Sequence, residues 1–403
     1  MPAGCGRRPV PRFIAILPAL VLLCLASCTL APEVAPPAPP PPPVPQVVVP
    51  ALTPVPWELV DGWPDPEPGP ALEAFLKSCQ GLKSRPQFQS ACSAAKAVNV
   101  VDPGAVQRFF EQYFTPHQVR NVDGTGSGLI TGYYVPELKG SRMPTARHKY
   151  PLYGLPDDLL VIDLRSVYPE LGDYRLRGRV VGRKVVPYWD RTVIDGPQQP
   201  LAGKELFWVE DPVELFFLHI QGSGRISLPG GEKIMLNYAD QNGHPYRSIG
   251  KLLLERGAMT RDQMSMQNIK EWARQNPESV AGLLGENPSY VFFRELDPGV
   301  QVPPGALGVP LTPGRSLAVD PRTIPLGAPV FIATTWPGGG GPLRRLMAAQ
   351  DTGGAIKGRV RADFFWGLGE EAGSYAGRTK QAGWLWVLLP KEAQTQAGAK
   401  TRP

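Results

Sequence analysis

The sequence predicts a mainly β protein that begins with short helices and contains a barrel interrupted by a second, β-rich domain. Three observations lead to this prediction. The 403 residues include 48 prolines and 44 glycines, which favours turns and short strands over a helical bundle. Short apolar runs, separated by Gly, Pro and Asp, continue from about residue 130 to 287. Similar runs reappear after residue 315, on the other side of this long insertion.

The first 27 residues have the pattern of a bacterial lipoprotein signal peptide. Arg7, Arg8 and Arg12 precede an uncharged run that ends in Leu-Ala-Ser-Cys at Cys28. This run is shorter than the roughly 20 residues needed to cross a bilayer, so a permanent transmembrane helix is the weaker interpretation. We expect cleavage before Cys28 and acylation of that residue, which gives stable anchoring in a membrane. Because Thr29 rather than Asp follows, the expected location is the outer membrane, facing the periplasm.

This location narrows the choice of binding partners, and the composition of two further segments predicts a linker and a disordered tail. The net charge of +6 would suit nucleic acid, anionic lipid or a carboxylate-bearing cell wall, and a periplasmic protein is not expected to meet nucleic acid. Residues 28–66 are predicted to form a Pro-rich linker, in which residues 31–56 favour an extended polyproline II spacer. A tail over residues 391–403 is predicted to be disordered.

Residues 67–136 are predicted to hold two or three helices and the first barrel strand. Leu72, Phe75 and Cys79 lie on one helical face, and Phe88 and Cys92 lie on another. In an oxidising periplasm, a disulfide between Cys79 and Cys92 is expected, and a loop of this size stabilises a fold by about 3 kcal/mol. The four histidines are scattered without ligand spacing, so we expect neither a metal site nor a cofactor.

Residues 137–288 are predicted to form the inserted β domain. The apolar run Val-Glu-Leu-Phe-Phe-Leu-His-Ile that begins at Val213 is interpreted as one of its strands. Helices are expected over residues 249–256 and 260–276, the second one opening with a capping box formed by Thr260 and Gln263.

Several polar and aromatic residues in or near this domain are candidates for carbohydrate binding. The motifs HIQGSGR and NGHPYR combine amides, hydroxyls, an aromatic ring and guanidinium groups. Tyr133 and Tyr134 could stack on sugar rings, but neighbours in a strand face opposite sides, so at most one lines a groove. For any one of these residues a purely structural role is an equal alternative. The candidate sugar-binding residues are Tyr133, Tyr134, Gln221, Ser223, Arg225, Asn242, Tyr246 and Lys357.

The segment from residue 350 to 369 carries the strongest catalytic pattern. It places Asp351 and Asp363 within a glycine-rich backbone that permits close approach of an extended polymer. The run Phe364, Phe365 and Trp366 puts apolar surface beside Asp363, and desolvation of this kind raises the pKa of a carboxyl. The alternative is that Asp351 caps a turn and Asp363 begins a strand.

A set of ordered motifs resembles one known family. SLAVDPRTIPLGAPVFI, AAQDTGGAIKG and RADFFWGLGEEAG are similar to the three-aspartate domain of the membrane-bound lytic murein transglycosylase A family. TGYYVPELKG, HIQGSGR, NGHPYRSIG and YVFFRE resemble other blocks of that family, so the similarity covers roughly residues 70–390. The resemblance implies a double-psi β-barrel, completed by a three-aspartate segment at residues 289–390, with a smaller β domain inserted and a groove between them.

The resemblance also implies an activity. The family cleaves the β-1,4 bond between N-acetylmuramic acid and N-acetylglucosamine of peptidoglycan without water, forming 1,6-anhydromuramic acid ends during wall turnover and recycling. The motif places the single catalytic acid and base at Asp363, with Asp351 and Asp320 as supporting carboxylates. The implied partners are peptidoglycan strands, membrane lipid through Cys28, and proteins of wall synthesis or division.

Two rival functions belong to other classes. Asp351-Thr352-Gly353 is also the signature of aspartic proteases, but those enzymes need two such loops and this chain has one. A non-catalytic peptidoglycan-binding barrel is the stronger rival. Loss of the acid would mark such a protein, and Asp363 is present.

Overall fold

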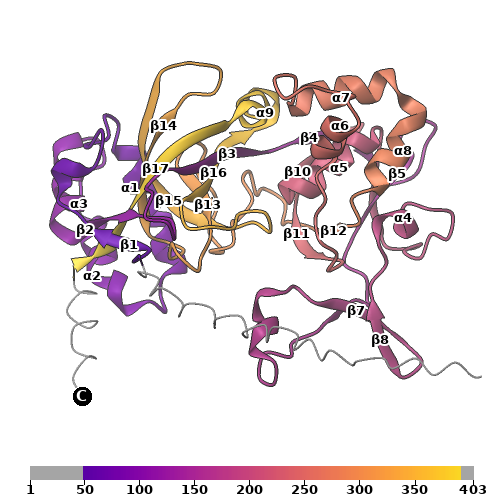
Figure 1. Cartoon of the computed structure of the whole chain (residues 1–403), viewed down its shortest axis with the longest axis horizontal. Coiled ribbons are helices and arrows are strands. Elements are labelled where there is room, and N and C mark those ends of the chain that lie inside the picture. The colour runs from indigo at the N-terminus through magenta and orange to yellow at the C-terminus, as the bar shows by residue number, and fades with distance from the viewer. Residues whose placement is uncertain (1–48, 392–403) are drawn as a thin grey trace, which may run out of the picture. The chain divides into compact units, whose positions relative to one another are not determined.

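The computed structural model describes residues 49–391, so the expected signal peptide, Cys28 and the tail from residue 392 lie outside it. The described chain is mainly β, with sheets of eight, six and three strands and helices on the surface of the larger two (Figure 1). Within residues 49–391, no helix is both long enough and apolar enough to cross a bilayer.

Residues 49–66 belong to the fold, so the prediction that a linker extends to residue 66 is wrong for them. The strand β1 (Leu52–Pro54) pairs antiparallel with β2 (Phe114–Val119). Trp63 packs its ring against the sheet core, and Asp65 forms an ion pair with Arg315 in which both residues are only 4% exposed. The high proline content of this segment favoured a linker in the sequence analysis. An edge strand nevertheless tolerates proline, because only one of its sides needs backbone N–H donors. A 3-10 turn, η1, spans Trp57–Leu59.

Three helices follow, as predicted, and each begins with a proline in its first turn, where the missing N–H costs nothing. The apolar faces expected from the sequence are the buried ones. Cys79 and Cys92 are joined by a disulfide with a Cα–Cα distance of 5.6 Å, which ties the first two helices together. The helices are α1 (Gly69–Gly81), α2 (Pro86–Ala95) and α3 (Pro103–Tyr113).

The eight-stranded sheet has the order β1-β2-β17-β14-β15-β13-β16-β3. The long strand β17 also pairs with β3, so the pairings of six strands, from β3 through β16, β13, β15 and β14 to β17, return to their starting point. The apolar runs predicted as strands after residue 315 all lie in this ring. The bounds are β3 (Gly128–Val135), β13 (Ser316–Val319), β14 (Pro329–Thr335), β15 (Pro342–Asp351), β16 (Arg361–Leu368) and β17 (Lys380–Pro390).

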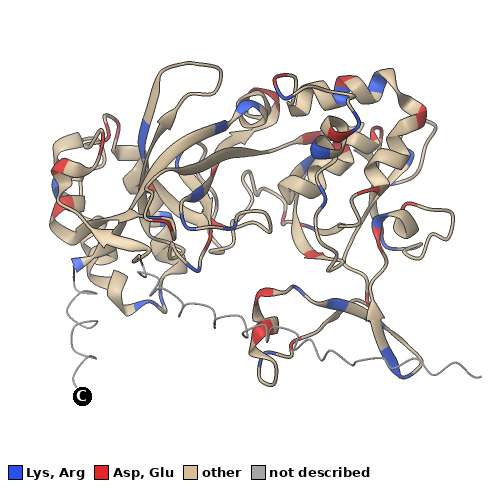
Figure 2. Ribbon diagram, viewed as in Figure 1, with Lys and Arg blue, Asp and Glu red and all other residues tan. Residues whose placement is uncertain are grey.

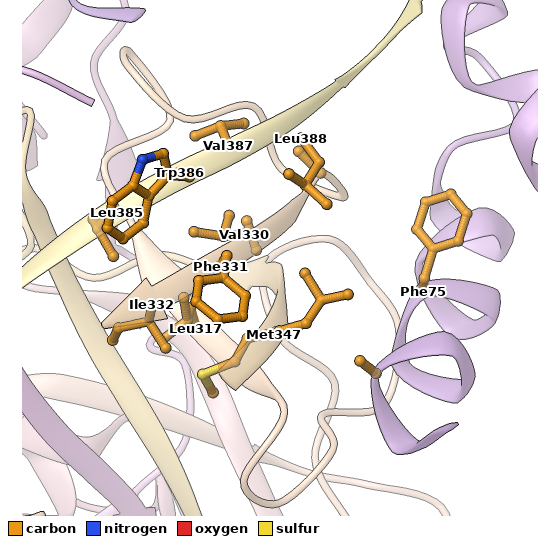
Figure 3. Close-up of a cluster of buried hydrophobic side chains, with 14 of the residues drawn as sticks. Phe75, Leu317, Val330, Phe331, Ile332, Met347, Leu385, Trp386, Val387 and Leu388 are labelled. Atoms are coloured by element: carbon orange, nitrogen blue, oxygen red, sulfur yellow. The ribbon is translucent and has the colours of Figure 1, made fainter. Parts of the chain in front are cut away.

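The largest hydrophobic cluster fills this ring and extends to the helices. Leu317, Phe331, Met347 and Leu385 come from four different strands and point toward one another, with Phe75 of α1 nearby (Figure 3). All five side chains are at most 1% exposed. Burial of this apolar surface is the main source of stability for the part of the fold that carries the aspartates.

The inserted segment between β3 and β13 forms the other two sheets. Its six-stranded sheet has the order β12-β11-β10-β4-β9-β5, and its three-stranded sheet the order β6-β7-β8. The bounds are β4 (Glu137–Ser141), β5 (Tyr150–Tyr153), β6 (Leu160–Val161), β7 (Arg177–Val181), β8 (Lys184–Pro187), β9 (Glu205–Val209), β10 (Ser223–Ser227), β11 (Lys233–Gln241) and β12 (Val291–Glu295), with a 3-10 helix η2 (Pro169–Asp173).

The apolar run beginning at Val213 is a helix, α5 (Pro212–Gln221), and not the predicted strand. Asp211 caps its first turn by accepting from the amides of Val213 and Glu214, and Gly222 ends it in the left-handed conformation. A buried apolar run of this length fits a strand or a helix equally well, and the flanking Asp-Pro and Gly decide for the helix.

The predicted helix over residues 260–276 begins later than expected. Gln263 does accept from the amide of Thr260, as a capping box requires, but α7 (Met266–Gln275) is capped by Ser265 instead. Its Ile269 is buried. A helix that the sequence analysis missed follows directly after Asn276. The remaining helices are α4 (Arg191–Ile194), α6 (Ile249–Glu255), α8 (Pro277–Gly285) and α9 (Gly369–Arg378).

Candidate active site

Two aspartates face each other across one strand of the eight-stranded sheet. Ala318 on β13 pairs with Asp351 on β15 at one side and with Asp363 on β16 at the other. Directly paired residues point to the same face of a sheet, so both carboxyls lie on one face. Their Cα atoms are about 10 Å apart, twice the spacing between neighbouring strands. Ala318 carries only a methyl group and therefore puts no bulky side chain between the carboxyls.

Asp363 is half-buried and is held by the next strand. Its Oδ1 accepts a hydrogen bond of 2.5 Å from the hydroxyl of Thr131, its pairing partner on β3. The Thr131 oxygen accepts in turn from Arg361 Nη2 at 2.8 Å, so the guanidinium fixes the direction of the hydroxyl proton. Burial raises the pKa of Asp363, although the Thr131 hydrogen bond and the charge of Arg361 oppose the rise. Such a carboxyl can keep its proton for transfer to a substrate.

The apolar wall beside Asp363 is smaller than the sequence suggested. Along β16 side chains alternate between faces, so Phe365 shares the face of Asp363 while Phe364 points into the core. Phe365 packs against the ring of Tyr133, with ring centroids 5.1 Å apart. Of the Phe-Phe-Trp run, only Phe365 therefore lies on the face of Asp363.

Asp351 occupies a more polar environment than Asp363. Its Oδ1 accepts from the backbone amides of Ala306 and Thr352, both at 2.9 Å, and its Oδ2 accepts from the hydroxyl of Tyr133 at 3.1 Å. Burial nevertheless raises its pKa to about 6, with repulsion from Asp363 adding to the rise and the three hydrogen bonds opposing it. Just above neutral pH, Asp351 is thus mostly a carboxylate that three donors hold in place.

The residue before Asp351 anchors this end of β15 to the helices. Gln350 is fully buried, and its amide nitrogen donates to the carbonyl of Ala74 at 2.8 Å and to the hydroxyl of Ser78 at 3.0 Å, both on α1. Its amide oxygen accepts from Ser316 at 2.5 Å. Because neighbours in a strand face opposite sides, fixing Gln350 inward fixes Asp351 outward.

The third aspartate, Asp320, has different surroundings. It is 2% exposed, and its carboxylate accepts from the guanidinium of Arg322 and from the amide of Gly358 at 3.0 Å. The hydrogen bonds from Arg322 lower its pKa to about 2, which keeps it ionised. Asp320 therefore joins the turn after β13 to the loop between Asp351 and Asp363.

The two tyrosines of the Tyr133-Tyr134 pair lie on opposite faces, as the strand geometry required. Tyr133 is 9% exposed and contacts Asp351, so it belongs to the site. Tyr134 is 5% exposed and packs against α9 near Met266, away from the carboxyls. Its backbone amide donates to Gln221 Oε1 at 3.0 Å, which attaches the end of α5 to β3.

The other candidate sugar-binding residues are dispersed. Ser223 donates to Asn237 at 2.7 Å, and Arg225 is paired with Glu137 at 2.9 Å. Asn242 is 1% exposed, and backbone groups of the inserted domain occupy both ends of its amide, so the prediction that it binds sugar is corrected to a structural role. The remaining two candidates are exposed, Tyr246 near the start of α6 and Lys357 in the loop after Asp351.

Sequence reasoning missed three residues of this site: Thr131, Ala318 and Arg361. Thr131 lies two positions before Tyr133, and the period of two in a strand was the signal that places it on the same face. The positions of Ala318 and Arg361 follow only from which strands are neighbours. Among residues 49–391, no three His, Cys, Asp or Glu side chains gather as metal ligands would.

Comparison with known proteins identifies two family domains in the chain. Residues 129–294 match the MltA specific insert domain, and residues 315–389 match the 3D domain. The membrane-bound lytic murein transglycosylase A of Vibrio cholerae serotype O1 is 33% identical over 307 residues, which is 73% of this chain and 74% of that protein.

Solved structures agree with the sequence comparison. MltA from Neisseria gonorrhoeae is 41% identical with a TM-score of 0.71, covering 84% of this chain and 91% of that one. Escherichia coli MltA with bound chitohexaose is 26% identical with a TM-score of 0.64, covering 86% of this chain and 96% of that one. On this evidence, the chain belongs to the membrane-bound lytic murein transglycosylase A family.

Proposed function

We propose that this protein is a lytic transglycosylase that cleaves the β-1,4 bond between N-acetylmuramic acid and N-acetylglucosamine in peptidoglycan, leaving 1,6-anhydromuramic acid ends. One observation carries the proposal: Asp363 and Asp351 flank the small Ala318 on one face of the sheet, in two different electrostatic environments. Two carboxyls in different surroundings, each with a pKa that burial raises, are suited to acid and base work on a glycosidic bond.

Asp363 is the proposed acid and base. In its protonated form, Oδ2 donates to the glycosidic oxygen as the bond to the anomeric carbon breaks. The resulting carboxylate then takes the proton of the C6 hydroxyl while that oxygen bonds to the anomeric carbon and closes the 1,6-anhydro ring. The C6 hydroxyl is part of the same sugar, so it has a high effective concentration relative to water.

Asp351 is the proposed supporting carboxylate. Its three hydrogen-bond donors favour the charged form, which can stabilise positive charge developing at the anomeric carbon. Tyr133 would position both Asp351 and a sugar ring, and Lys357, Gln221 and Ser223 remain candidates for contacts to the glycan. Asp320 is proposed to act through the loop alone, because Arg322 and Gly358 occupy its carboxylate.

The proposal extends to architecture and location. The cyclic pairing of six strands supports a double-psi β-barrel, into which the segment between β3 and β13 is inserted, with the glycan lying between the two parts. The chitohexaose in the Escherichia coli neighbour supports binding of an extended oligosaccharide. Acylation of Cys28 would hold the enzyme at the outer membrane, facing the periplasm, and the membrane-bound name of the Vibrio cholerae relative supports anchoring.

Purified protein incubated with murein sacculi tests this function. We expect soluble muropeptides with 1,6-anhydro ends, detected by mass spectrometry, and their loss in Asp363→Asn. Glu73→Gln, which changes an exposed carboxyl on α1, is the matched control and should retain full release. Binding without any product would indicate the non-catalytic wall-binding alternative, and reducing ends without the anhydro ring would indicate a hydrolase. Full activity in Asp363→Asn, with none in Asp351→Asn, would reverse the two roles.

A further inference from the structure

A loop of the inserted segment lies close to the loop that follows Asp351, between β15 and β16. This excursion, residues 162–177 between β6 and β7, is attached at two points. Arg177 Nε donates to both oxygens of Asp240 on β11, at 3.0 and 2.9 Å, and both side chains are at most 15% exposed. Asp173 lies 3.6 Å from Arg322, the residue that also holds Asp320. Figure 2 shows a basic segment on β7, in the lower part of the view.

Arg175 lies between these two attachment points and beside the loop that follows Asp351. A Cβ atom built on Gly354 would be 3.8 Å from Arg175 Nη1, so the guanidinium lies close to that loop. Gly354 is three residues from Asp351, which limits the distance between their Cα atoms to about 11 Å. The charge of Arg175 also acts on Tyr238, where it opposes the burial that raises the pKa of that hydroxyl to about 12.

Arg175 differs in its partners from the other arginines around the site. Arg177 is paired with Asp240, Arg322 with Asp320, and Arg361 donates to Thr131. The Arg175 side chain is exposed, and within residues 49–391 it takes part in no ion pair and no side-chain hydrogen bond. The ion pairs of Arg177 and Asp173 hold the loop near the proposed glycan site, and the guanidinium of Arg175 has no ion-pair partner of its own among the described residues. Such a guanidinium is suited to bind a carboxylate with two parallel hydrogen bonds.

We propose that Arg175 binds a carboxylate carried by the murein strand and thereby distinguishes murein from neutral glycans. The inference rests on the proposed function, since it assigns a specificity residue to that same site. Murein offers such a carboxylate in two places, on the stem peptide and, where the peptide has been removed, on the lactyl group of muramic acid. Chitin oligomers offer none.

Binding measurements on three ligands test the assignment. The full-length protein carries Asp363→Asn to block cleavage, and titration calorimetry measures its dissociation constants for murein glycan with stem peptides, for amidase-stripped glycan and for chitohexaose. Adding Arg175→Gln should weaken binding of an anionic glycan about tenfold, the loss of one charge-assisted interaction, and leave chitohexaose binding unchanged. Arg183→Gln, an exposed cation at the β7–β8 turn, is the matched control and should change none of the three.

The pattern of losses identifies the carboxylate. A loss confined to the peptide-bearing glycan assigns the stem peptide, and a loss with the stripped glycan assigns the lactyl group. Equal losses on all three ligands, or no loss on either anionic glycan, would overturn the proposal. Because binding is measured without turnover, failure of the wild-type enzyme to form anhydro products would refute the proposed function and leave this result standing.

Discussion

Replacing Asp351 by Asn should increase stability at neutral pH while reducing activity. Burial raises the pKa of Asp351 from 3.8 to about 6, so the folded protein binds this proton more tightly than the unfolded chain does. The carboxylate therefore costs nothing below about pH 4, costs more as the pH rises to about 6, and costs its full amount above that pH. Asparagine carries no such charge, and its carbonyl oxygen can still accept from the amides of Ala306 and Thr352.

The pKa values give the size of the effect. At 1.36 kcal/mol per pKa unit, the change from 3.8 to about 6 corresponds to about 3 kcal/mol. Asp351 is only half-buried, so solvent screening reduces the expected gain for Asp351→Asn to about 1–2 kcal/mol. The gain should be measured as the difference in free energy of unfolding between variant and wild type, from urea titrations at about pH 4 and about pH 7.5.

The comparison between the two pH values is the decisive result. The advantage of Asp351→Asn over wild type should grow by about 1–2 kcal/mol from the lower to the higher pH. Glu73→Gln, which removes an exposed carboxyl, should show no such growth. If the advantage is equal at both pH values, or shrinks as the pH rises, then Asp351 is not a destabilised buried carboxylate and its electrostatic role is wrong.

Two further substitutions test the positions of the carboxyls. Thr131→Val removes the hydrogen bond that opposes the raised pKa of Asp363, so the alkaline limb of the pH–rate profile should move to higher pH while kcat falls, and Thr131→Ser should restore both; an unchanged limb would contradict this. Gly305→Ala would put a Cβ 2.5 Å from a backbone carbonyl and 3.2 Å from Asp351 Cβ, so kcat and melting temperature should fall, whereas Gly282→Ala, with nothing within 4 Å, should lower neither.

The sequence predicted the strand that ends at Asp351 and the helices α1, α2 and α3, because these elements have clear apolar patterns. It did not predict β16, the strand that carries Asp363. It misread α5, since a mostly buried run, with six of the ten residues of α5 buried, is compatible with either a helix or a strand. The sequence analysis named Tyr133 as a candidate sugar-binding residue because of its aromatic ring, and it did not name Thr131, which lies on the same face of the strand. No local pattern reveals that Ala318 lies between Asp351 and Asp363, because that fact depends on a non-local order of strands.

The motif similarity singled out three aspartates but did not reveal their surroundings. In the sequence, Asp320, Asp351 and Asp363 have similar surroundings, since each lies in a motif that contains glycine. In the structure one is held ionised by Arg322, another accepts three hydrogen bonds and the third is desolvated with one hydroxyl partner. These differences come from burial and from donors on distant segments, such as the amide of Ala306, which the sequence does not bring together.

The prolines around β1 have a consequence for how copies of this chain behave toward one another. β1 is the outermost strand of its sheet and only three residues long; Pro54 is its last residue, and Pro50 and Pro56 lie on either side of it. Proline has no amide hydrogen, so this border offers an incoming strand few donors. The proline-rich composition therefore also disfavours strand pairing between the exposed sheet edges of two copies of this chain, even where the local protein concentration is high.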